Sequence, residues 1–153
     1  MRLPAELYGQ LLRDLLAEGT PVITTVHGAS MAPFIPDGAT VRIVPVSAGE
    51  AAVGQVVVRS WGGGRLLCHR LSARRGERVQ TWGDACFEPD GWGAATEIIG
   101  RVEAIQAGEQ WRRVVERPPW RMCWRTVKRR LRQWLRLVQP PGPPPCEPDQ
   151  GVA

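Results

Sequence analysis

Short runs of β-branched residues, separated by glycine and proline turns, limit this chain to a strand-rich fold. Residues 22–26 read VITTV, and residues 39–46 alternate apolar and polar side chains, a pattern that is typical of strands. Further runs of this kind follow at 54–60, 65–71, 79–82 and 97–105. Glycine and proline number 17 and 14 among 153 residues, which suits tight turns between strands. We therefore expect one mainly β, antiparallel body.

One helix is expected ahead of the strands, over residues 4–18. Pro4 suits a first helical turn, and Gly19 can end the helix. Four leucines recur between them at helical spacing: Leu7, Leu11, Leu12 and Leu15. No stretch reaches the about 18 uncharged apolar residues that a membrane span needs. We therefore expect no signal peptide and no transmembrane helix, and a location that is cytoplasmic or peripheral to a membrane.

The composition changes near residue 109. Residues 109–139 are rich in arginine and tryptophan. Apolar residues at steps of three and four predict a basic amphipathic helix over 120–138. Residues 140–153 are proline-rich and polar, which is typical of disorder. The expected divisions are an N-terminal helix, a β domain, an Arg/Trp-rich tail and a disordered end, over 1–20, 21–108, 109–139 and 140–153.

The positive charge is concentrated in the tail. Residues 1–108 carry 10 basic and 11 acidic side chains, whereas residues 109–153 carry 10 and 4. Cations beside tryptophans favour either contact with an anionic membrane surface through residues 120–138 or packing on the β body. Nucleic acid is an unlikely partner by comparison, because no recognised binding motif accompanies the charge. The only lysine is Lys128.

The cysteines do not indicate a metal site. None of the four lies in a CxxC pair, so zinc ligation is not signalled. We expect unpaired thiols in a reducing compartment, no metal and no cofactor.

Residues 28–33 (GASMAP) form a candidate nucleophile turn. A serine between glycine and proline, just after a β run, is held on a tight turn. Such a turn can expose the Ser30 hydroxyl and aim backbone N–H groups at a developing oxyanion. Gly28 and Met31 are the candidate residues of this oxyanion and substrate region. Ordinary turn chemistry is the alternative interpretation of the serine.

A serine nucleophile needs a base, and His69 is the leading candidate. Alternation along the predicted strand 65–71 places His69 on one face with Leu67 and Leu71, opposite Arg70. A core histidine bonded to the backbone is the alternative. His27 lies three residues before the serine in the same turn, where local geometry disfavours contact with the hydroxyl.

A loop after the predicted strand 79–82 carries two aspartates six residues apart, Asp84 and Asp90. Either carboxylate can orient an imidazole and stabilise its charged form. Turn capping is the commoner use of an aspartate in a loop, so the pair alone does not decide the matter.

Together these elements resemble the signal peptidase I family. Residues 28–33 match its nucleophile motif, glycine–any–serine–methionine–any–proline. The next stretch, IPDGATV at 35–41, is similar to the family's proline–glycine–aspartate–any–valine segment, with Ala39 in place of the usual aspartate. The resemblance covers roughly residues 22–105.

Three further motifs are similar to the archaeal and endoplasmic-reticulum branch of that family. They are the pair His69-Arg70, the pair Gly83-Asp84 with the later Asp90, and the closing IGRV at 99–102. The resemblance implies the antiparallel β fold of the signal peptidases and SOS-repressor peptidases. The branch normally begins with a membrane-spanning helix, which this sequence does not contain.

The resemblance implies a serine endopeptidase that cleaves a leader or signal-type precursor peptide after small residues. Bacterial signal peptidases and SOS-repressor peptidases use a Ser–Lys dyad, but the lysine of this chain, Lys128, lies in the tail. Arginine cannot replace it, because arginine does not deprotonate in proteins. Ser30 is thus the expected nucleophile and His69 its base. Carried over by position, Asp90 orients His69 and Asp84 supports the site.

Two other functions remain open. Self-cleavage in the manner of the SOS repressors is disfavoured, because no Ala-Gly pair precedes Ser30. The main alternative is a binding module, in which an inactive peptidase fold carries a basic tail for nucleic acid or membrane.

Overall fold

The computed structural model of the protein describes residues 4–62 and 64–116. Helix α1 covers Ala5–Ala17 and ends at Glu18, so the predicted N-terminal helix is confirmed. Its buried face differs from the one that the leucine spacing suggested. The side chains of Leu12 and Leu16 are each 3% exposed, whereas Leu7 and Leu11 are 54% and 46% exposed.

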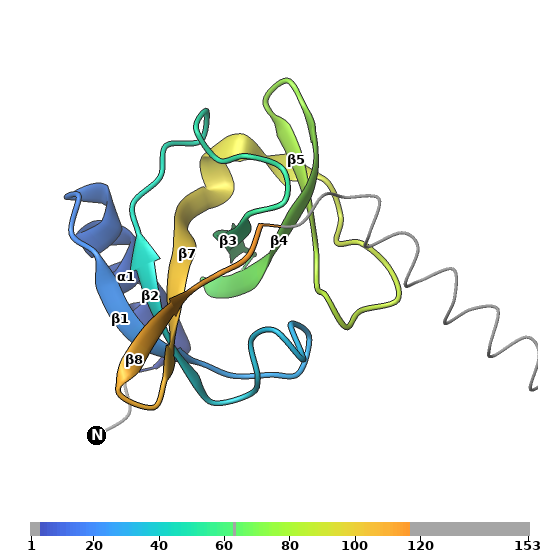
Figure 1. The fold of residues 1–153 in the computed structure, drawn as a ribbon. Helices are drawn as coiled ribbons and strands as arrows, with labels where there is room; N and C mark the ends of the chain where they lie inside the picture. Colours follow the sequence, from blue (N-terminus) through green and yellow to red (C-terminus); the bar gives the residue numbers. More distant parts are fainter. Residues whose placement is uncertain (1–3, 63, 117–153) are drawn as a thin grey trace, which may run out of the picture.

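Within the described residues, eight strands form a single sheet in which every pair is antiparallel. They are β1 (Val22–Val26), β2 (Ala39–Val44), β3 (Val56–Trp61), β4 (Arg65–Arg75), β5 (Arg78–Trp82), β6 (Gly93–Ala94), β7 (Ile98–Ala107) and β8 (Gln110–Arg113). A 3-10 turn, η1 (Ala95–Glu97), leads into β7. The predicted mainly β class is therefore confirmed. Figure 1 shows the curled sheet with α1 beside β1.

The strand order is β1-β2-β7-β3-β4-β5-β6, and β8 pairs with β7 off this path. Two hairpin-like pairs, β1–β2 and β3–β4, are joined in the sheet only through β7, which follows both in the chain. β8 carries the sheet past residue 108 to Arg113. The predicted helix over 120–138 and the proline-rich end lie outside the described residues.

β3 is buried on both faces because a separate apolar cluster covers each of them. Val56 and Val58 pack into one core with Leu12 and Leu16 of α1. Val57 points the other way, into a second cluster that includes Leu71 of β4. Three successive valines fit a strand with apolar surroundings on both sides.

No helix among the described residues is long and apolar enough to span a membrane.

Candidate active site

Ser30 lies on the turn that connects β1 to β2, and two buried neighbours hold that turn in place. The side chains of Met31 and Ile35 are almost fully buried in the core that α1 covers. The Ile35 N–H donates to the Met31 carbonyl, and the Ala32 N–H donates to the Ala29 carbonyl. The serine is half-buried, so its hydroxyl projects from a turn that the core anchors.

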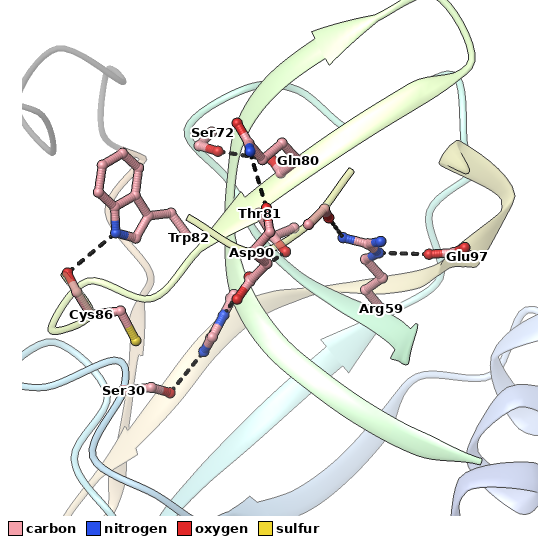
Figure 2. Close-up of polar contacts among 11 residues, drawn as sticks. Ser30, Arg59, Ser72, Gln80, Thr81, Trp82, Cys86, Asp90 and Glu97 are labelled. Atoms are coloured by element: carbon pink, nitrogen blue, oxygen red, sulfur yellow. Dashed lines mark hydrogen bonds and ion pairs between the residues drawn. The ribbon is translucent and has the colours of Figure 1, made fainter. Parts of the chain in front are cut away.

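His69 comes from β4, opposite Val57 of β3. Its imidazole is buried, and Nε2 lies 2.9 Å from Ser30 Oγ. The other ring nitrogen, Nδ1, lies 2.7 Å from Asp90 Oδ2. An ionised carboxylate only accepts hydrogen bonds, so Nδ1 carries the proton and Nε2 is left to accept from the serine hydroxyl. Figure 2 shows Ser30 and Asp90 at the two ends of this hydrogen-bonded chain.

Asp90 is held by the end of β5. The Thr81 hydroxyl donates to Asp90 Oδ2 at 2.6 Å, and the Asp90 N–H donates to the Thr81 carbonyl at 2.8 Å. Partial burial opposes ionisation of Asp90, but hydrogen bonds from His69 and Thr81, with the charges of His69 and Arg59, outweigh it and lower the pKa of this carboxyl. Asp90 therefore stays ionised and can stabilise a protonated imidazole.

Asp84 does not reach His69. Its carboxylate binds Arg70, with Nε to Oδ1 at 2.9 Å and Nη2 to Oδ2 at 2.7 Å. Arg70 Nη1 also donates to the carbonyls of Gly54 and Val115. Arg70 follows His69 in β4 and points to the opposite face of the strand. Of the two loop aspartates, the structure thus brings Asp90 to the serine and histidine and leaves Asp84 with Arg70.

Backbone N–H groups beside Ser30 differ in whether they have an acceptor among the described residues. The N–H of Gly28 donates to Asp37 Oδ1 at 2.8 Å, so it is not available to a substrate. Within the described part of the chain, the N–H groups of Ser30 and Met31 have no protein acceptor. His27, the other histidine, lies 3.6 Å from Asp37 on the surface and does not contact Ser30.

Two residues that the sequence did not single out, Thr81 and Arg59, shape the site. Thr81 is completely buried and holds Asp90; its alternation with Val79 in a predicted strand was a detectable signal. Arg59 is buried as well, and it donates to the Glu97 carboxylate at 2.7 Å and to the Gly91 carbonyl at 3.0 Å. Arg59 thereby ties β3 to the residue that follows Asp90 (Figure 2).

Gly83, which the sequence analysis named only as part of a motif, also shapes the site, because its surroundings leave no space for a side chain. A Cβ at this position would lie 2.6 Å from Cys86 Sγ, 2.8 Å from the Ser30 carbonyl oxygen and 3.0 Å from His69 Nε2. The adjacent Ala85 N–H donates to the same Ser30 carbonyl at 2.7 Å. The loop after β5 therefore packs directly against both Ser30 and His69.

A hydroxyl, an imidazole and a carboxylate lie in series, an arrangement that can supply a nucleophile, a base and a group that orients the base. No group of three or more histidine, cysteine or acidic side chains in the described residues could hold a metal ion. The Peptidase S24-like family matches the chain over residues 5–81, a span that includes Ser30 and His69 and ends before the aspartates. No curated protein and no solved structure matches the chain.

Proposed function

The chain belongs to the S24-like peptidase family, and from that premise we propose that it is a serine endopeptidase that cleaves a leader or signal-type precursor peptide after small residues. One observation carries the proposal. Ser30 Oγ lies 2.9 Å from His69 Nε2, and His69 Nδ1 lies 2.7 Å from the Asp90 carboxylate. A serine hydroxyl is a weak nucleophile until a base at this distance accepts its proton.

The proposed reaction has two stages. In the first, His69 Nε2 takes the Ser30 proton as Oγ attacks the scissile carbonyl carbon, and the Ser30 and Met31 N–H groups donate to the oxyanion. The tetrahedral intermediate collapses, His69 returns the proton to the leaving amine, and an acyl ester remains on Ser30. In the second, His69 deprotonates a water that attacks the ester, which releases the carboxyl product and restores the hydroxyl.

Two open strand edges suit an extended peptide substrate. Among the described residues, β1 pairs only with β2, and residues 65–69 of β4 pair only with β3. A cavity that both strands line contains Ser30 and His69 in its wall. A peptide that adds to a free edge gains main-chain hydrogen bonds while alternate side chains enter pockets. The preference for small residues rests on the resemblance to signal peptidases.

A membrane contact is the second part of the proposal. Residues 120–138 carry seven cations and no acidic side chain, with tryptophans at positions 120, 124 and 134. Such a segment, as an amphipathic helix, favours an anionic membrane surface. This part rests on the sequence alone and leaves the chemistry at Ser30 unchanged.

A fluorophosphonate probe tests whether Ser30 is an activated nucleophile. We expect the full-length protein to be labelled, the Ser30→Ala variant to remain unlabelled, and the control variant Ser47→Ala, which loses an exposed serine, to be labelled as wild type. Cleavage of quenched peptides should follow the same pattern. A wild-type protein that neither reacts with the probe nor cleaves peptides would favour the alternative, a binding module on an inactive peptidase fold.

A further inference from the structure

A cavity of about 440 Å³ opens beside Ser30 and His69, a volume within the range of ligand pockets. Three of the elements that form its walls flank the opening: β1 through Thr24 and Val26, β4 through Leu66 and Cys68, and α1 through Tyr8 and Leu12. The first two walls are the open strand edges. The third, from the N-terminal helix, closes the space between strands that do not pair with each other.

Contacts at both sides hold α1 in this place. The Tyr8 hydroxyl hydrogen-bonds the Thr24 hydroxyl of β1. On the other side, Gly9 meets the turn between β3 and β4, where a Cβ on Gly9 would lie 2.5 Å from the Gly64 carbonyl oxygen. Leu12 is buried in the same core as Met31, next to Ser30. The helix is therefore a fixed wall that bridges β1 and the β3–β4 turn.

We propose that Tyr8 of α1 is a specificity-determining residue, whose ring limits the size of the uncharged substrate side chain that enters this cavity. The inference rests on the proposed peptidase function and deepens it. Apolar side chains dominate the lining. Burial raises the pKa of the Cys68 thiol to about 12, so Cys68 stays uncharged, and the charged Arg65 lines the cavity from the exposed start of β4. An aliphatic substrate side chain suits such a lining better than a charged one.

Tyr8 is a sharper test position than Leu12. Tyr8 is 37% exposed at the rim of the cavity, so its truncation opens the wall without leaving a void in the core. Leu12 packs in the core, and its loss would destabilise the whole fold. Leu7, the preceding residue on α1, is 54% exposed and does not line the cavity, which makes it a matched control.

The experiment profiles cleavage of a quenched peptide library by the full-length protein. We expect wild type to restrict one substrate position to small aliphatic residues. Tyr8→Ala should raise kcat/KM for peptides with Leu or Phe at that position, relative to Ala, by about tenfold or more. Tyr8→Phe, which keeps the ring but loses the hydroxyl that contacts Thr24, should stay close to wild type, as should Leu7→Ala. An unchanged ratio in Tyr8→Ala overturns the assignment.

A binding measurement separates this inference from the peptidase proposal. N-acetyl-alaninamide and N-acetyl-leucinamide are titrated into Ser30→Ala and Ser30→Ala/Tyr8→Ala, with the methyl resonances of Val26 and Leu66 as the readout. A gain in relative affinity for the leucine compound in the double variant supports the role of Tyr8, even if wild type cleaves no peptide. Equal relative affinities in the two proteins overturn it, even if cleavage is observed.

Discussion

The Arg70 guanidinium donates two parallel hydrogen bonds to the Asp84 carboxylate, at 2.9 and 2.7 Å. The two side chains are only 1% and 3% exposed. Arg70 also holds the backbone carbonyls of Gly54 and Val115, so one buried cation joins β4 to the segment after β8. Asp84 neutralises the Arg70 cation, whereas Asp90 hydrogen-bonds His69, the residue before Arg70.

Substitution of Asp84 should therefore lower stability, whereas substitution of Asp90 should lower activity. Asp84→Asn leaves the buried Arg70 charge unpaired, and we expect the free energy of unfolding to fall by about 3 kcal/mol or more. Asp90→Asn loses the group that fixes the imidazole tautomer, and we expect kcat to fall on the order of 10³-fold or more in a folded protein. Urea unfolding and peptide cleavage measure the two effects. A larger loss of kcat in folded Asp84→Asn would assign the orienting role to Asp84.

Ser30→Ala and His69→Ala should each abolish cleavage. Members of one catalytic unit act together, so each loss is expected on the order of a thousand-fold or more, and the double variant should be little worse than either single one. Circular dichroism and thermal melting provide the folding control. Substantial activity in His69→Ala would rule out this histidine as the base.

The Asp90 carboxylate should contribute to the loss of folding stability at acid pH. Because the folded-state pKa of Asp90 lies below its unfolded value, the unfolded chain binds the proton more tightly. The stabilising effect of the Asp90 carboxylate is fully present above its pKa in the unfolded chain, about 3.9. This effect is lost as pH falls through the pKa of Asp90 in the folded protein. Thermal melts from pH 7 to 3 should show a smaller decline for Asp90→Asn than for wild type. Parallel declines would indicate that other carboxyls dominate.

Arg59→Met should loosen the loop that carries Asp90. The substitution keeps an apolar stem but removes the bonds to Glu97 and to the Gly91 carbonyl. We expect a loss of about 1–3 kcal/mol in unfolding free energy and a fall in kcat that exceeds any change in KM. Arg42→Met, which removes an exposed pair with Glu103, is the matched control. Equal effects of both variants on kcat would argue against a link between Arg59 and the site.

The tail proposal predicts binding to anionic vesicles. Full-length protein should sediment with vesicles that contain phosphatidylserine and not with neutral ones, and added salt should weaken the binding. Truncation after Glu116 is the suitable control, because a cut after Gln110 would remove β8 and the Val115 carbonyl that Arg70 binds. If the full-length protein remains in the supernatant with anionic vesicles at low salt, the proposed membrane contact is wrong.

The sequence indicated the strands and the candidate site residues because both depend on local pattern. Strand alternation placed His69 and Arg70 on opposite faces, which the ion pair with Asp84 requires. Arg59 could not be found in this way. Its burial depends on contacts with Gly91 and Glu97, which lie more than 30 residues away and are brought near by the sheet.

The buried face of α1 could not be predicted from the local sequence pattern either. The leucine spacing allowed several faces to pack, and the expected stripe included Leu7 and Leu11, which are largely exposed. The close approach of Gly9 to the Gly64 carbonyl turns Leu12 and Leu16 inward instead. That approach depends on where the β3–β4 turn lies, which the sequence of the helix does not contain.

The position of β7 in the sheet affects when the proposed site can first form during synthesis of the chain. Ser30 belongs to the β1–β2 pair and His69 to the β3–β4 pair, and β7 joins the two pairs only after all of these residues have been synthesised. Each hairpin can form early, since its contacts are local, but the docking of β7 closes long loops and is slower. A polypeptide still emerging from the ribosome, or one truncated before Ile98, therefore lacks the strand that joins the two pairs in the sheet, and on the proposed function we expect it to have no proteolytic activity.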